Sequence, residues 1–304
     1  MDWRLKVGCT WAAGILSPGG QLNYLLQRHV THSVPVPDTS LESSVAMARR
    51  HLETVRRHFT GKQIDSLAFY EFGAGWDMAI PLAYWALGVR RQTVVDIRRL
   101  LRPSLVQNML NRLSHLLMRG EPLPKIACVR LDETVSQLRA IYGIDYRAPA
   151  DARSTSLPSA SVDVITSTST LEHIPEPDAL RILAECRRLL RPDGIITAHI
   201  ACDDHYAAAD SSITRLNFLR YERGTWGWLN PPLHYQNRLR SSDYIRLFRD
   251  AGFDILDVTL RQATEEDRRG MGTEWAPASC FKHYEPTDLT VTHAFLVARP
   301  AAAN

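Results

Sequence analysis

The sequence of 304 residues lacks several features that would set a protein apart from ordinary globular domains. Its five cysteines are scattered and form no C-x-x-C pair, which argues against a disulfide framework or a structural zinc site and favours a reducing compartment, the cytoplasm. No apolar run approaches the ~18 residues that a membrane span needs. The formal net charge is only +3, and no long run of lysine and arginine points to nucleic acid. No internal repeat or low-complexity linker is present.

A glycine-rich turn is the most informative feature that the sequence does contain. The run Glu71–Gly75 (EFGAG) follows an apolar segment, 64–70, and precedes another, 78–87, that has the pattern of a helix. A strand, a glycine turn and a helix present backbone N–H groups to a nucleotide-like ligand, and glycine lets the backbone approach that ligand closely. A second β-rich run then ends in Asp96, at about the position where an acid binds a ribose.

Strands and helices alternate from the glycine turn onward. We expect helices at 41–59, 78–87, within 98–142, at 177–190 and at 241–251, and strands at 64–71, 92–96, 162–166, 195–200, 253–260 and 289–298, with a further short segment near 145–150. A turn at 192–194 separates the helix that ends near 190 from the strand at 195–200, and 264–288 has a loop-like composition. This alternation predicts a parallel sheet with helices on both faces.

The order of these motifs resembles that of the class I S-adenosylmethionine-dependent methyltransferases over about residues 64–200. Glu71, Gly73 and Gly75 resemble the first motif of that family, an acid followed by two glycines at alternate positions. Asp96 matches the acid that binds both ribose hydroxyls in the family. The resemblance therefore implies that Glu71, Gly73, Gly75 and Asp96 bind S-adenosylmethionine as the cofactor.

Two further positions of the predicted cofactor site come from the same resemblance. Asp151 and Ala152 are similar to the adenine-side motif, in which the acid accepts a hydrogen bond from the adenine amino group. A solvated loop acid is the alternative interpretation of Asp151. The family's third glycine is replaced here by Asp77, which we expect to cap the following helix.

Candidate catalytic residues follow the fourth and fifth strands, where the acceptor pocket should open. His173 could serve as a general base, or it could pack against the cofactor without moving a proton. His205 lies in a cluster of acids and histidines, 199–206, and competes with His173 for this role, as do His199 and His234. A divalent metal bound by this cluster, as in some sugar and catechol methyltransferases, is a second possibility, but no metal site is predicted because the other ligands are not recognisable.

The polar and aromatic segment that follows suggests an acceptor-binding region. Tyr235 is a candidate for stacking on the acceptor, and Arg238 for holding a carboxylate or phosphate. The alternatives are that the aromatic side chains close a small hydrophobic core and that the arginine ties the segment to the rest of the protein.

The resemblance implies an α/β fold with a doubly wound, mostly parallel, seven-stranded Rossmann-like sheet. We divide the chain into an N-terminal helical cap (1–60), a cofactor-binding core (61–200), a substrate-binding insertion after the fifth strand (201–240) and the closing helix and strands (241–304). The expected activity is methyl transfer to an O or N atom of a small molecule such as a glycan, a sugar-linked intermediate or a secondary metabolite.

Two alternatives accompany this hypothesis. One is an RNA or protein methyltransferase, which the modest basicity alone favours, and the other is a non-catalytic partner subunit with the same fold. The expected partner is a small-molecule acceptor, with no membrane and no nucleic acid, and a homo-oligomer is left open.

Overall fold

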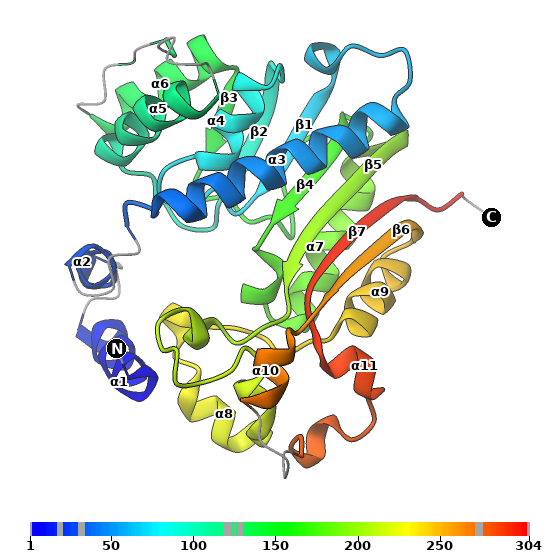
Figure 1. Cartoon of the computed structure of the whole chain (residues 1–304). Coiled ribbons are helices and arrows are strands. Elements are labelled where there is room, and N and C mark those ends of the chain that lie inside the picture. Colours follow the sequence, from blue (N-terminus) through cyan, green and yellow to red (C-terminus); the bar gives the residue numbers. More distant parts are fainter. Residues whose placement is uncertain are drawn as a thin grey trace.

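One sheet of seven strands organises the protein. The computed structural model describes residues 2–16, 21–29, 34–117, 123–124, 126, 130–270 and 276–302. Within them the strands are β1 (Ala68–Phe72), β2 (Arg91–Val95), β3 (Ile144–Arg147), β4 (Val162–Thr168), β5 (Leu190–Ala201), β6 (Phe253–Gln262) and β7 (Val291–Pro300). Their order across the sheet is β3-β2-β1-β4-β5-β7-β6 (Figure 1).

The pairing confirms the predicted fold class. Strands β1 to β5 run parallel to one another, whereas β7 runs antiparallel to both β5 and β6. The chain enters at the centre with β1, moves outward to β3, and returns to continue with β4 on the other side. The strand order therefore reverses between β1 and β4, and in open α/β sheets ligands bind beyond the strand ends at such a reversal.

Helices cover both faces of the sheet. On one face α3 (Asp38–His58), α4 (Ala79–Ala86), α5 (Pro103–Leu117) and α6 (Leu131–Tyr142) share a hydrophobic core with β1, β2 and β3. On the other, α7 (Glu176–Leu189) and α9 (Ser241–Asp250) pack against the later strands. The predicted helix at 41–59 corresponds to α3, which buries its apolar positions Leu41, Val45, Leu52 and Val55.

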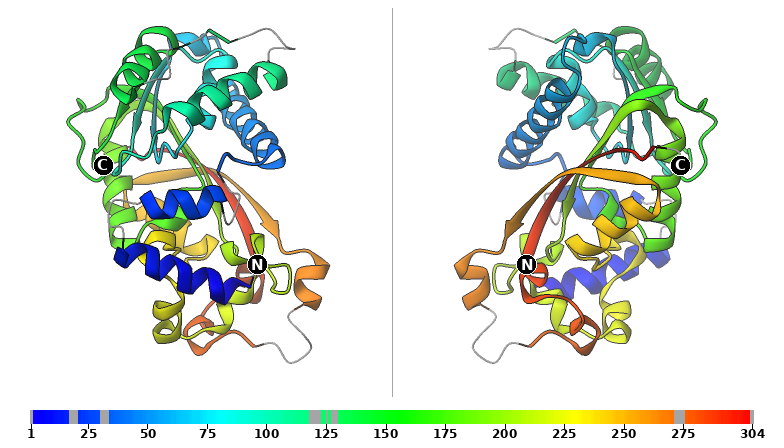
Figure 2. Two further views of the ribbon diagram at one scale, coloured as in Figure 1. Left: turned by 90° about the vertical axis from the view of Figure 1, so that its left-hand side faces the viewer. Right: turned by 90° about the vertical axis from the view of Figure 1, so that its right-hand side faces the viewer.

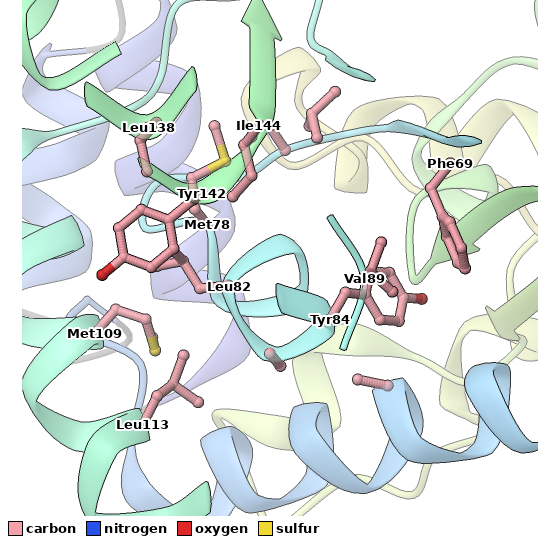
Figure 3. Close-up of a cluster of buried hydrophobic side chains, with 14 of the residues drawn as sticks. Phe69, Met78, Leu82, Tyr84, Val89, Met109, Leu113, Leu138, Tyr142 and Ile144 are labelled. Atoms are coloured by element: carbon pink, nitrogen blue, oxygen red, sulfur yellow. The ribbon is translucent and has the colours of Figure 1, made fainter. Parts of the chain in front are cut away.

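The first of these cores is shown in Figure 3. Phe69 of β1 and Tyr84 of α4 lie with ring centroids 5.8 Å apart, and Trp85 meets Tyr142 of α6 at 4.7 Å. Leu82 is fully buried within the same cluster. The apolar segment 78–87 therefore forms α4 because its side chains fill the space between the sheet and the neighbouring helices.

The N-terminal helices α1 (Trp3–Leu16) and α2 (Gln21–His29) lie apart from the helices that cover the sheet (Figures 1 and 2). Helix α1 packs on the short helix Pro232–His234 of the segment that follows β5. Trp3 joins the buried aromatic cluster of that segment, with Tyr206 at a centroid distance of 5.6 Å. None of the described helices combines the length and apolar composition that crossing a bilayer requires.

The structure differs from the predicted elements at three places. The expected turn at 192–194 lies within β5, where the pairing with β4 shifts from Val162–Leu190 to Val164–Ile195 and leaves these residues as a bulge. Residues 64–66 form a 3₁₀ turn, so β1 begins only at Ala68. The loop-like stretch at 264–288 contains two short helices, α10 (Glu265–Arg269) and α11 (Pro286–Leu289).

The segment after β5 builds a small core of its own. It contains α8 (Arg223–Leu229) and several 3₁₀ turns, and Phe218, Leu219 and Trp226 are buried with residues of α1. Arg240, at the end of the segment, is fully buried and donates to the carbonyls of Cys202, at 2.8 Å, and Val291. These hydrogen bonds fasten the segment to the ends of β5 and β7.

Candidate functional site

A cavity of about 680 Å³ lies beyond the carboxyl ends of the parallel strands. Its wall begins at the glycine turn after β1 and passes Asp96 after β2 and Asp151 after β3. It continues along the segment after β4 and ends at residues 232–235. The sheet therefore brings together side chains that are far apart in the sequence.

The glycine turn adopts a backbone that explains its composition. Gly73 and Gly75 have φ values of +88° and +68°, in the left-handed region that glycine enters without strain. Both line the cavity, and the Gly73 N–H donates to the Val95 carbonyl at 2.9 Å, which joins the turn to β2. Asp77 accepts from the Ala79 N–H at 3.1 Å, but the cap position of α4 is the next residue, Met78, and not Asp77 as expected.

Glu71 occupies a different position from the glycines that follow it. Its side chain is buried and accepts from the Thr166 hydroxyl at 3.3 Å, and it does not contribute to the cavity wall. Burial raises the pKa of the Glu71 carboxyl to about 8, and the Thr166 hydrogen bond only partly opposes that shift. The structure therefore brings Glu71 beneath the cavity rather than into it.

Asp96 stands at the cavity wall at the end of β2. Its side chain is only 8% exposed, and its Oδ1 accepts from the Arg98 N–H at 2.9 Å. Burial raises the pKa of this carboxyl, and the backbone N–H groups of Arg98, Gly75 and Ala74 act in the opposite direction. The next residue, Ile97, is an apolar side chain 61% exposed at the cavity.

Asp151 lines the cavity but already has a partner. Arg153 donates to both of its carboxylate oxygens, with Nη2 to Oδ2 at 2.7 Å, and the same arginine reaches Asp178 at 2.8 Å. The side-chain hydrogen bond from Arg153 lowers the pKa of Asp151. Ala152 lies between them on the same wall. Sequence reasoning missed Arg153, since no motif pairs it with Asp151.

Two predicted catalytic residues meet at the opposite end of the cavity. The imidazole centroids of His173 and His205 are 4.9 Å apart, and both residues line the wall with Tyr235. His173 Nδ1 lies 2.8 Å from the Tyr235 carbonyl oxygen. A carbonyl can only accept, so Nδ1 carries the proton and the lone pair of the neutral ring is on Nε2. Burial lowers the pKa of both imidazoles, and that of His205 falls well below its usual range.

Glu172 completes this group of titratable side chains. It is 1% exposed, its Oε1 accepts from the Ala201 N–H at 3.2 Å, and its buried Oε2 has no hydrogen-bond partner among the residues that the structure describes. One ligand atom each from Glu172, His173 and His205 lies within 4.8 Å of the others. Burial raises the pKa of Glu172 to about 8. The sequence did not reveal this set because Glu172 carries no signal beyond its neighbour and His205 comes from a separate segment.

Of the remaining predicted residues, His234 lines the cavity, whereas Arg238 and His199 do not. Arg238 donates to the Phe218 carbonyl at 2.9 Å and to the Tyr221 carbonyl, and its guanidinium lies over the Trp226 ring at 5.2 Å. These contacts hold Arg238 within the segment 201–240 itself, whereas the alternative interpretation of the sequence had it tie that segment to the rest of the protein. His199 stacks on His293 at 5.3 Å and does not line the cavity.

The N-terminal helices contribute residues that sequence reasoning did not foresee. Lys6, Cys9 and Thr10 of α1 and Gln27 of α2 form part of the wall. No spacing relates them to the glycine turn, so only the folded chain reveals this proximity. Among the described residues, Cys9, Cys186, Cys202 and Cys280 are free thiols.

Comparison with known families assigns a class to this arrangement. Residues 125–198 match the family model described as a methyltransferase domain, a range that includes β3, β4 and most of β5 but not the glycine turn. A search of curated proteins finds no match.

Solved structures share the fold at low sequence identity. The carbon methyltransferase CurJ is 13% identical, with a TM-score of 0.50 over 95% of this chain and 61% of that one. The 1,6-didemethyltoxoflavin-N1-methyltransferase of Burkholderia thailandensis, solved with 1,6-didemethyltoxoflavin and S-adenosylhomocysteine, is 14% identical, with a TM-score of 0.49 over 96% and 89%.

The family match and the fold confirm the predicted resemblance. Residues 125–198 are thus similar to a methyltransferase domain, and the chain shares the Rossmann-like fold of the carbon methyltransferase CurJ.

Proposed function

We propose that this protein transfers the methyl group of S-adenosylmethionine to an O or N atom of a small molecule, such as a glycan, a sugar-linked intermediate or a secondary metabolite. One observation carries the proposal. A single cavity of about 680 Å³ is lined both by the glycine turn with Asp96 and by His173 with His205. Such a cavity holds donor and acceptor side by side, as an in-line transfer requires.

The proposal places the cofactor at the end formed by β1, β2 and β3. The turn at Gly73 and Gly75 receives the amino-acid part of the cofactor, and Asp96 accepts from the ribose hydroxyls. Ile97 offers an exposed apolar surface for the adenine ring. Asp151 and Ala152 border the adenine amino group, with Arg153 as a competing partner of the acid. Glu71 supports the turn from below through its hydrogen bond with Thr166.

The acceptor occupies the end of the cavity that His173, His205 and Tyr235 line. The protonation of His173 at Nδ1 leaves its Nε2 lone pair free to withdraw a proton from the acceptor, which is the simplest way to activate a hydroxyl or amine. Helix α1 and residues 232–235 border this end and favour a small acceptor over an RNA or a protein. Arg238 is not part of the proposed acceptor site, because its guanidinium is engaged elsewhere.

The division of the chain at residues 60, 200 and 240 fits this proposal. Under it, 1–60 contributes the cover through α1 and α2, 61–200 and 241–304 form the cofactor-binding core, and 201–240 supplies the acceptor side. The cytoplasmic location and the possibility of a homo-oligomer stay predictions from the sequence.

The first experiment is calorimetric titration of the intact protein with S-adenosylmethionine, followed by incubation with a panel of hydroxyl and amine acceptors. S-adenosylhomocysteine should form only with an acceptor, whose mass should rise by one methylene group. His173→Ala should lower turnover by about 10²-fold and leave cofactor affinity nearly unchanged. Turnover that needs RNA or a protein, with steep salt dependence for RNA, would replace the small-molecule assignment. Cofactor binding without any turnover would favour a non-catalytic partner subunit.

A further inference from the structure

We propose that Glu172, His173 and His205 form a binding site for one divalent transition-metal ion, of the kind that zinc or ferrous iron represents. The ligand atoms of the three side chains lie within 4.8 Å of one another, and two of the residues, His173 and His205, line the cavity. Imidazole nitrogens with a carboxylate suit zinc, iron, nickel or copper better than magnesium or calcium, which prefer oxygen alone.

The unpaired oxygen of Glu172 is the observation that points to a ligand. Oε1 of this carboxyl accepts from the Ala201 N–H, whereas Oε2 is buried with no hydrogen-bond partner in the described residues. A buried polar atom without a partner costs about 1–3 kcal/mol, and such atoms are uncommon in folded proteins. A cation between Oε2 and the two imidazoles would provide the missing interaction.

The orientation of His173 matches that of a metal ligand. Metal-bound histidines usually donate their second ring N–H to a carbonyl or a carboxylate, which fixes the ring and its tautomer. His173 makes this contact from Nδ1 to the Tyr235 carbonyl at 2.8 Å and so directs the lone pair of Nε2 away from it. The 3₁₀ turn Leu171–His173 holds Glu172 and His173 on one short segment, and His205 approaches from the segment after β5.

The three side chains would have to move only slightly to bind an ion. Metal–nitrogen and metal–oxygen bonds of about 2.0–2.2 Å place neighbouring ligand atoms roughly 3–3.5 Å apart. Closing the site therefore takes shifts of roughly 1 Å, within the reach of side-chain rotation. His234, whose Nε2 is also buried without a partner, lies next to His205 with ring centroids 6.4 Å apart.

Three protein ligands leave further coordination positions that face the cavity. In an extension that rests on the proposed function, an acceptor hydroxyl binds there and the ion lowers its pKa, so that its proton leaves to water. The oxygen then attacks the methyl carbon of the cofactor, the carbon–sulfur bond breaks, and its electron pair stays on sulfur. With the ion bound, His173 and His205 would act on the acceptor through it, whereas without the ion the Nε2 lone pair of His173 takes the acceptor proton as described above.

Metal binding can be tested without knowing the acceptor. The intact protein, stripped with a chelator and dialysed, is titrated with Zn²⁺ by calorimetry and with Co²⁺ by visible absorption. We expect one tight site per chain and Co²⁺ bands typical of a nitrogen and oxygen ligand set. Substitution even of residues that only contact the ligands of a metal typically lowers metal affinity by about 10–100-fold. Glu172→Gln and His205→Ala should therefore each weaken binding of the ion at least about tenfold. His293→Gln, a histidine outside the cavity, is the matched control and should bind like the unaltered protein.

Cofactor titration and thermal unfolding of the same samples separate the possible failures. Glu172→Gln keeps an oxygen for the Ala201 N–H, and His205→Ala provides a second variant if the first does not fold. The metal site is overturned if the unaltered protein binds S-adenosylmethionine but no stoichiometric Zn²⁺ or Co²⁺. It is also overturned if folded Glu172→Gln and His205→Ala bind the ion as tightly as the His293→Gln control. A protein that binds the ion but not the cofactor would contradict the proposed function and leave the metal site standing.

Discussion

Thr170 occupies the space that a side chain on Gly73 would need. An ideal Cβ built on Gly73 would lie 2.5 Å from Thr170 Oγ1 and 2.6 Å from its Cγ2. Thr170 is itself held by a hydrogen bond from its hydroxyl to the Thr168 carbonyl at 3.1 Å. The first glycine of the turn is therefore fixed by two independent conditions, its positive φ and the close approach of the segment after β4.

Gly73→Ala should reduce both stability and cofactor affinity. The positive φ costs about 1–2 kcal/mol for an alanine, and the contact with Thr170 adds strain that forces the turn to move. Cofactor affinity, measured by calorimetry, should fall at least about tenfold. The control is Gly61→Ala, where φ is also positive but nothing lies within 4 Å of the added Cβ. Equal losses of stability in the two variants would show that Thr170 does not restrict the turn.

Asp96→Ala should weaken cofactor binding more than tenfold, or by over ~1.4 kcal/mol, if the carboxylate accepts from the ribose. Asp96→Asn retains an oxygen for the Arg98 N–H and should lose less stability than the alanine variant. Calorimetric titration with S-adenosylmethionine measures the effect. Asp193→Asn, an exposed acid paired with Lys62, is the control and should leave the affinity unchanged. An Asp96→Ala protein of normal affinity would remove this residue from the site.

Arg238→Met should act on stability rather than on the acceptor. The guanidinium donates to the Phe218 and Tyr221 carbonyls and lies over the rings of Trp226 and Phe281. Loss of these charged hydrogen bonds should lower the free energy of unfolding by about 2 kcal/mol or more. The measurement is denaturant unfolding, with the KM of an identified acceptor as the second readout. A folded variant of normal stability whose acceptor KM rises strongly would restore Arg238 as a substrate-binding residue.

Because of His51, the free energy of unfolding should decrease as the pH falls below neutral. Its buried ring lies 2.7 Å from the Thr197 hydroxyl and 3.3 Å from that of Thr168. Burial, with smaller contributions from His199 and Arg50, lowers the pKa of His51 from 6.5 to about 3. Between these two values the unfolded chain binds a proton that the folded chain does not. This contribution to stability is therefore complete above about pH 6.5 and is lost as the pH falls toward 3.

His51→Gln should accordingly flatten the dependence of stability on pH. Denaturant unfolding from pH 7 to pH 4 should show a slope smaller by up to ~1.4 kcal/mol per pH unit, the contribution of a single proton. The slope is the diagnostic quantity, because the substitution also changes stability at neutral pH. His58→Gln, which replaces an exposed histidine, is the matched control. An unaltered slope in His51→Gln would mean that His51 does not titrate on unfolding in this range.

The sequence by itself predicted the fold class and the framework of the proposed cofactor site. Apolar residues repeat every second position in a strand and about every 3.6 positions in a helix, so the two elements can be told apart in the sequence. Because each element must bury its apolar face, strands that alternate with helices form a parallel sheet covered by helices. The glycine turn and Asp96 could be found because they are local: each directly follows a strand, and parallel strands end at one edge. For the same reason His173, next to the end of β4, could be placed at the same edge of the sheet.

Tertiary structure decided what depends on contacts between distant segments. The pairing of His173 with His205, the unpaired oxygen of Glu172 and the approach of α1 to the cavity follow from how the segment after β5 folds back over the strand ends. The partners of Arg238 and Arg153 could not be predicted from the sequence either, because an arginine can donate to a ligand, a carboxylate or a backbone carbonyl equally well. Which partner it takes depends on the groups that packing brings within about 3 Å of it, and no local pattern in the chain contains that information.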